Sequence, residues 1–214
     1  MQHEVGGKAA AEVFEDPKVA SLAEAACRGD GEAVKRAAAQ GADVNYRGLE
    51  GVSPLLWALS CESVEGMGAL LQEGADPNAA DDGGSTALYY AATYRNPELL
   101  RLLLKRGGNP NIVNASGYTP LEAAVSYLSS TGSTVNFDVL IDAGADPFLK
   151  NANGDSIVEI AAYRNQYELV YRLLKNGYDG DKGRLLRIVQ TGAISSTSPQ
   201  APWRDRVLAL LEKA

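Results

Sequence analysis

The sequence predicts an all-α solenoid, in which copies of a helix-turn-helix unit stack side by side. A Gly-Ala-Asp phrase or a close variant recurs with glycine intervals of 33, 33, 37 and 33 residues. A Ser/Thr-Pro-Leu phrase or a close variant recurs at intervals of 33, 33 and 37 residues. Because both phrases share the same irregular interval, they mark one repeating unit, and periods of this length indicate a stacked array. The glycines are Gly41, Gly74, Gly107, Gly144 and Gly177, and the hydroxyl residues are Ser53, Thr86, Thr119 and Ser156.

The first helix of each unit is expected to begin at the hydroxyl residue. A Ser or Thr side chain there accepts a backbone N–H that has no partner inside the helix, which is worth about 1 kcal/mol. Pro54 and Pro120 follow at the first helical position, where a missing N–H costs nothing. The helix is short and rich in small residues, as in Ala-Leu-Tyr-Tyr-Ala-Ala at 87–92, so neighbouring helices can approach closely.

The second helix of each unit is expected to carry a leucine stripe. Residues 98–106 read Glu-Leu-Leu-Arg-Leu-Leu-Leu-Lys-Arg, with leucines toward the stack and charges toward water. Gly107 is placed to end this helix in a left-handed conformation. The polar segment 109–117 that follows has the composition of turns.

These features resemble the ankyrin repeat, a hairpin loop followed by two antiparallel helices. The family's Thr-Pro-Leu-His-x-Ala phrase matches residues 53–58, 86–91, 119–124 and 156–161, and its Gly-Ala-Asp-x-Asn phrase matches 41–45 and 74–78. Its histidine is replaced in every unit, by Leu56, Tyr89, Glu122 and Glu159. We therefore expect the hydrogen bonds between adjacent hairpins to be missing or differently made.

The array is expected to span residues 20–182, with about five units of the predicted repeat. Residues 1–19 form an N-terminal lead and the start of a cap, and residues 183–214 form a C-terminal cap with helices over 184–190 and 203–212. Terminal units need such caps because they must present a polar outer face. The interval of 37 places four extra residues in the segment 129–134, which is either a surface loop or a finger that contacts a partner.

The composition excludes several classes of function. The 214 residues carry 20 basic and 27 acidic side chains, a net charge of −7, which argues against nucleic acid or an anionic membrane surface as the partner. No apolar run is long enough for a membrane span. The single histidine, His3, and two cysteines cannot supply a catalytic triad or a zinc site, so no metal or cofactor is expected.

Cys27 and Cys61 fall in neighbouring units. Packed helices lie about 8–10 Å apart, whereas a disulfide needs Cα atoms within roughly 7 Å. We therefore expect both cysteines to be reduced thiols. The segment Met1–Ala11 has no apolar stretch of the kind found in signal peptides, and both periplasm and cytoplasm stay open as locations, with the periplasm slightly favoured by an immunity function.

The resemblance implies a protein-binding concave face, formed by the hairpin tips and the exposed side of the first helices. Tyrosine and arginine are enriched at interface hot spots, so a row of tyrosines in successive units is expected to contact the partner. Tyr94, Tyr127 and Tyr163 are its main members. The full set of expected contacts is Tyr46, Arg47, Glu50, Asp82, Tyr94, Tyr118, Tyr127, Asp155, Tyr163 and Arg164.

The resemblance further suggests a non-enzymatic bacterial immunity protein that neutralises a cognate secreted toxin, such as a lipase or phospholipase effector. The acidic balance favours a partner with a basic surface, and the chain alone is expected to be monomeric. The alternative is a scaffold or host-directed effector that bridges other proteins. An enzyme that uses carboxylates alone would need two of them in one pocket, whereas an array exposes a groove.

Overall fold

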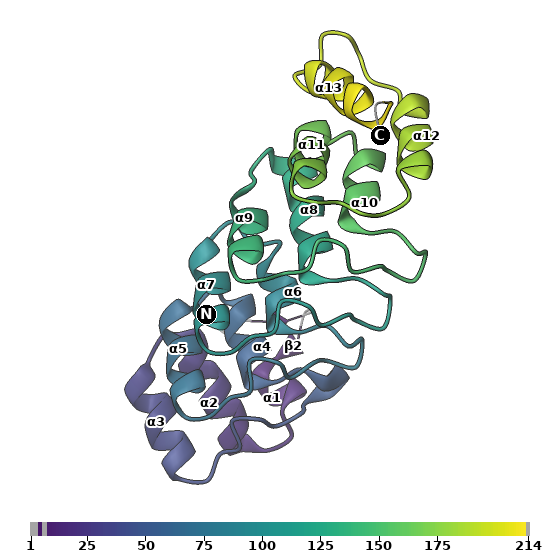
Figure 1. Cartoon of the computed structure of the whole chain (residues 1–214). Helices are drawn as coiled ribbons and strands as arrows, with labels where there is room; N and C mark the ends of the chain where they lie inside the picture. Colours follow the sequence, from purple (N-terminus) through teal and green to yellow (C-terminus); the bar gives the residue numbers. More distant parts are fainter. Residues whose placement is uncertain (1–3, 6–7, 213–214) are drawn as a thin grey trace.

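The chain forms an elongated stack of helix pairs in the computed structural model, which describes residues 4–5 and 8–212 (Figure 1). His3 lies outside the described residues. The first helices are α2 (Pro17–Cys27), α4 (Pro54–Ser60), α6 (Ala87–Ala91), α8 (Pro120–Thr131), α10 (Ile157–Tyr163) and α12 (Lys182–Thr191). The second helices are α3 (Gly31–Ala39), α5 (Val64–Gln72), α7 (Pro97–Lys105), α9 (Val135–Asp142), α11 (Tyr167–Lys175) and α13 (Ala201–Leu211). The all-α repeat fold is confirmed.

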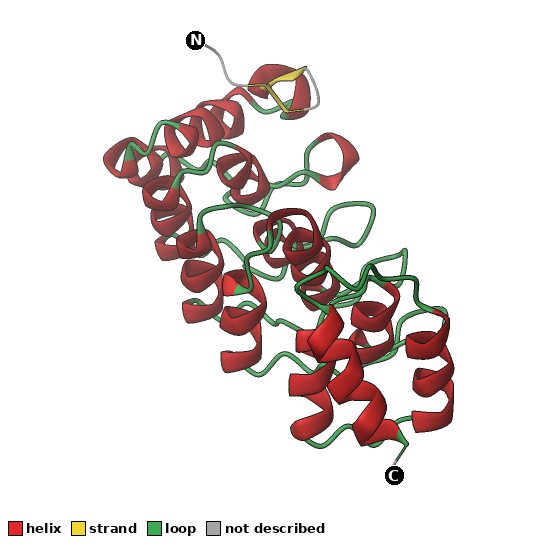
Figure 2. Cartoon of the chain, turned by 90° about the horizontal axis from the view of Figure 1, so that it is seen from above, coloured by secondary structure: helices red, strands yellow, loops and turns green. Residues whose placement is uncertain are grey.

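The two sets of helices lie in two rows, and the loops between successive units project to one side of the stack (Figure 2). A short 3-10 helix, η1 (Leu49–Gly51), lies in the first of these loops. Before the first unit, two antiparallel strands of two residues each, β1 (Glu4–Val5) and β2 (Lys8–Ala9), lead into α1 (Ala10–Val13).

Hydroxyl caps begin four of the six first helices, α4, α6, α8 and α10, as predicted. In each, the side-chain oxygen accepts a backbone N–H two or three residues ahead, at 3.2–3.4 Å. The four caps are Ser53, Thr86, Thr119 and Ser156. The second helices end where a glycine takes a left-handed conformation, for example Gly74 with φ of 92°.

One continuous apolar core runs along the stack from Leu22 to Leu211. Leu99, Leu100 and Leu103 of α7 are fully buried, as the leucine stripe predicts. Burial of each such side chain is worth about 1.5–3 kcal/mol. Ala91 and Ala92 are also fully buried, and their small size lets the first helices of adjacent units approach.

Asparagine side chains tie each unit to the next. The amide of Asn78 donates to the carbonyl of Gly107 at 3.0 Å and accepts from the N–H of Asn109 at 2.7 Å. Asn45 and Asn111 make the same pair of bonds to the following unit, at 2.8–3.3 Å. Each asparagine therefore satisfies backbone groups where the second helix of the following unit ends, and it sets the distance between units.

Aromatic packing takes over where this series stops. Phe148 occupies the asparagine position of the fourth phrase, and its ring lies 6.0 Å from that of Tyr178. The Tyr178 hydroxyl donates to Glu159, one of the residues that replace the family's histidine. Glu122, another of them, accepts from the Asn151 amide of the next hairpin at 3.1 Å. In the units of Glu122 and Glu159, the hydrogen bonds at this position are thus made differently, by carboxylates.

The cysteine prediction is wrong, because Cys27 and Cys61 form a disulfide with their Cα atoms 5.4 Å apart. The prediction used the distance between helix axes. Each Cα lies about 2.3 Å from its own axis, so facing Cα atoms on helices 8–10 Å apart come within roughly 3.5–5.5 Å. Cys27 ends α2 and Cys61 follows α4, and these two helices pack against each other.

Two further segments differ from the sequence-based description. Residues 8–19 are a folded cap, because Phe14 is buried with its ring 5.7 Å from Trp57, and α2 already begins at Pro17. The four extra residues lengthen α8, which has 12 residues where α10 has seven. Residues 129–131 of the inserted segment continue α8, and residues 132–134 form the turn to α9.

Asn78→Ala is expected to lower the free energy of unfolding by about 1–2 kcal/mol, because two hydrogen bonds between units are lost. Urea unfolding followed by circular dichroism measures the change. Asn153→Ala is the control, since this exposed hairpin asparagine makes no side-chain hydrogen bond to the described residues. An equal loss in both variants would contradict a linking role for Asn78.

Reduction of the disulfide is expected to lower the free energy of unfolding by about 3–4 kcal/mol, given a sequence separation of 34. Denaturant unfolding with and without dithiothreitol measures this loss. The double variant Cys27→Ser, Cys61→Ser should match the reduced protein and ignore the reductant. A wild-type protein that unfolds identically in both buffers, with reduction verified by mass, would refute the estimate.

Candidate protein-binding surface

The expected contact residues fall into two regions of the stack. Hairpin loops carry Tyr46, Arg47, Glu50, Asp82, Tyr118 and Asp155, whereas Tyr94, Tyr127, Tyr163 and Arg164 lie at the ends of the first helices. The two regions differ in how many of their side chains already bind other residues of the chain.

Charged hairpin residues mostly contact one another. Arg47 makes an ion pair with Asp82 at 2.8 Å and donates to the carbonyl of Ala80 at 2.6 Å. The carbonyl of Glu50 accepts the N–H of Asp82 at 3.0 Å, with Glu50 itself in a left-handed conformation (φ 58°). These residues therefore link two hairpins, although both members of the ion pair are more than half exposed.

Asp155 is committed to the C-terminal cap. It is 8% exposed and accepts from the Arg184 guanidinium of α12 at 2.5 Å. This carboxylate raises the pKa of Arg184 above its ordinary value, and the Tyr163 hydroxyl adds to the effect. A nearly buried, paired carboxylate presents little to a partner, so Asp155 is a linking residue of the fold.

The two hairpin tyrosines differ from each other. Tyr46 is half-buried, and its ring meets Phe14 edge-on at 6.3 Å, so it belongs to the N-terminal cap. Tyr118 is 43% exposed on its hairpin. Only Tyr118 of this pair offers a large aromatic surface to solvent.

The tyrosines at the helix ends are not all in one register. Tyr94 and Tyr127 each lie eight residues after their N-caps, Thr86 and Thr119, whereas Arg164 holds this place after Ser156. Tyr163 is one residue earlier and 56% exposed. Tyr94 packs against the core, and burial raises its pKa. We call Tyr94, Tyr127, Tyr163 and Arg164 the helix-end row.

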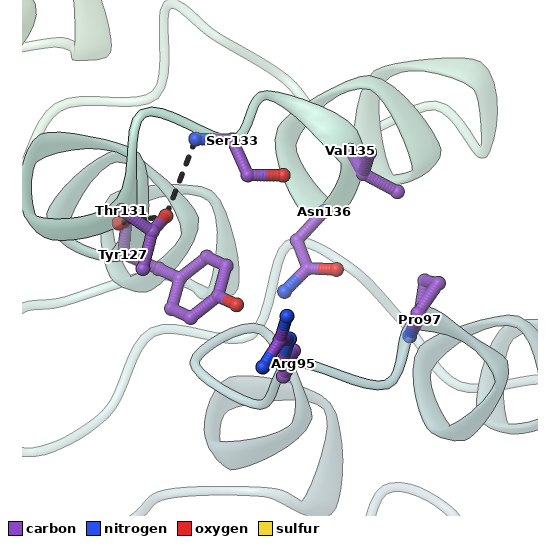
Figure 3. Close-up of a pocket in the computed structure, with 7 residues that line it drawn as sticks. All are labelled: Arg95, Pro97, Tyr127, Thr131, Ser133, Val135 and Asn136. Carbon is purple, nitrogen blue, oxygen red and sulfur yellow. Dashed lines mark hydrogen bonds between the residues drawn. The ribbon is translucent and has the colours of Figure 1, made fainter.

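A hollow of about 460 Å³ opens beside Tyr127. It lies between the turn before α7, the end of α8 and the start of α9, so the lengthened α8 supplies one wall. Figure 3 shows Tyr127 and Thr131 on one side, Val135 and Pro97 on the other, and Arg95 and Asn136 between them. Ser133 completes the lining. We call this the α8–α9 hollow.

Asn136 holds the hollow in shape. Its amide donates to the carbonyls of Ala92 and Tyr94, at 2.9 and 2.8 Å, and so ties the start of α9 to the turn of the preceding unit. Neither Asn136 nor Arg95 was expected from the sequence. A polar residue in the first turn of a second helix was the only available signal for Asn136, while Arg95 adjoins the predicted Tyr94.

The electrostatics change sign at the hollow. The segment 48–94 contains seven acidic residues and no Lys or Arg. Arg95 is the next charged residue, and it is the only charged side chain that lines the hollow. An acidic stretch of the array therefore ends at the exposed cation Arg95.

Within residues 4–5 and 8–212, no helix is long and apolar enough to cross a membrane. Comparison with curated proteins found no match. The family description "Ankyrin repeats (3 copies)" matches residues 22–114 and 69–151, which together span more than half of the chain. Members of that family generally act as non-enzymatic protein-interaction modules. The stacked helix pairs of this chain agree with the match, and the chain belongs to the ankyrin repeat family.

Proposed function

We propose that this chain is a monomeric inhibitor that binds and neutralises a secreted protein toxin through its helix-end row. The observation that carries the proposal is the open surface formed by Tyr127, Tyr163 and Arg164 beside a hollow. Tyrosine and arginine are enriched among the few residues that dominate the energy of protein interfaces. In contrast, the described residues contain no cluster of three or more metal-ligating side chains.

The disulfide supports a location in an oxidising compartment such as the periplasm. Disulfides persist in such compartments and are rare in the reducing cytosol. Cys27 and Cys61 are both half-buried, so a reductant can reach the bond. An inhibitor in that compartment would meet a toxin as it arrives from outside the cell.

The charge distribution supports a partner with a basic surface. Residues 183–214 carry five basic and two acidic side chains, so the preceding 182 residues hold 15 basic and 25 acidic ones. An acidic array attracts a basic partner over a distance of about 8–10 Å at physiological salt and speeds its association. The toxin class proposed first is a lipase or phospholipase effector.

The alternative function is a scaffold or host-directed effector that bridges two proteins. The observation that favours it is the second exposed region on the hairpins, where Tyr118 is 43% exposed. A bridging protein would hold two partners at once, one on the helix-end row and one on the hairpins. An inhibitor needs only one.

Affinity capture followed by an activity assay tests the inhibitor. The disulfide-intact chain is immobilised and exposed to a secreted-protein fraction of the source organism, and the captured protein is identified and produced alone. Its hydrolysis of phospholipid vesicles should fall to background near one equivalent of added chain. Undiminished hydrolysis, or two different proteins held together, would reject the inhibitor, and the second result would favour the scaffold.

The double variant Tyr127→Ala, Tyr163→Ala is expected to weaken binding of the captured protein roughly tenfold or more. Tyr94 is left intact because it packs against the core. Lys105→Ala, an exposed residue at the other end of α7, is the matched control and should bind as the wild type does. Titration calorimetry measures affinity, and a thermal scan checks that the variants stay folded. Unchanged affinity in the double variant would remove the row from the interface.

A further inference from the structure

The α8–α9 hollow is a built feature of one unit rather than a general property of the array. Its wall exists because α8 runs about one turn further than α10, and Tyr127 and Thr131 both lie on that stretch. The floor is Asn136, which is 2% exposed and bonded to two carbonyls of the preceding unit. The hollow is therefore set by hydrogen bonds and helix packing before any partner arrives.

Asn136 has an acceptor left over. Both hydrogen bonds of its amide N–H groups are made within the protein, whereas no described residue donates to its Oδ1 atom. This oxygen is not sealed from solvent. Figure 3 shows the oxygen directed away from Arg95, on the side of Val135 and Pro97. A backbone N–H entering the hollow would satisfy this oxygen.

The remaining lining selects for an apolar side chain next to an acid. Val135 is 44% exposed, and with Pro97 and the Tyr127 ring it offers apolar surface inside the hollow. Arg95 is exposed and makes no ion pair within the described residues. A guanidinium binds a carboxylate through two parallel hydrogen bonds.

We propose that the α8–α9 hollow binds a partner polypeptide segment in which an aliphatic residue is followed by Asp or Glu. The aliphatic side chain lies against Val135, Pro97 and Tyr127, the carboxylate pairs with Arg95, and a backbone N–H of the segment donates to Asn136 Oδ1. This rests on the proposed function only in requiring a protein partner. The acidic segment 48–94 repels carboxylates along the preceding units, so Arg95 is the first cation after that segment that can accept an acidic group.

Peptide titration of the full-length, disulfide-intact chain tests the proposal. The probes are Ac-GSLESG-NH2, its lysine counterpart Ac-GSLKSG-NH2 and its serine counterpart Ac-GSSESG-NH2, each followed by amide NMR shifts on labelled protein. The first should bind in the millimolar range or tighter and shift the amides of Tyr127, Val135 and Asn136. The other two should bind roughly tenfold more weakly.

Charge reversal supplies the second arm. The Arg95→Glu variant should no longer bind the glutamate peptide and should bind the lysine peptide instead. Lys105→Glu makes the same charge change at the far end of α7 and should leave both affinities unchanged. Equal binding of the three peptides, shifts outside the hollow, or no shift at all would overturn the proposal. Those results would leave the toxin-inhibitor proposal standing. The inhibitor is tested separately, by capture, by inhibition of hydrolysis and by the binding of the double tyrosine variant.

Discussion

The contact between neighbouring units is the constraint on which the rest of this structure depends. A pair of short helices cannot bury its apolar face alone, and each pair here completes its core against the next one. Apolar packing does not by itself fix how far one unit slides along another. The asparagine side chains do, because Asn78 bonds at once to a carbonyl and an N–H of the following unit. Every exposed row of side chains inherits its spacing from this contact.

Most of the fold could be predicted because short sequence patterns determine where each helix begins and ends. Hydroxyl caps, leucine stripes and the glycines that end helices act within a few residues of sequence. The roles of Ser53 and Gly74 can therefore be predicted without knowing which units pack against them. The disulfide could not be predicted with the same success, since it depends on which faces of α2 and α4 meet. The conformation of the four extra residues was also not predicted. The sequence does not show whether α8 ends near Leu128 or continues past it, and in the structure it continues to Thr131.

The candidate site was harder to predict than the fold for a physical reason. Register identifies which side chains leave the helix bundle, but not which of them find partners there. Arg47 and Asp82 belong to successive hairpins and pair with each other, and Asp155 pairs with Arg184 of the cap. Opposite charges one unit apart tend to meet in a stack. Tyr163 lies on the same exposed side, and its ring stays 56% exposed although its hydroxyl lies near Arg184. Asn136 was missed because its partners lie more than 40 residues away in sequence.

A repeat array with identical units would offer a partner several equivalent positions. This chain breaks that equivalence in one place, where the insertion lengthens α8 and the sign of the charge changes at Arg95. A basic partner drawn to the acidic segment 48–94 gains no register from that attraction, because the field is diffuse. Arg95 beside a shaped hollow supplies the register, since a carboxylate of the partner is repelled along the segment 48–94 and accepted at Arg95. Affinity and alignment thus come from different parts of the same surface.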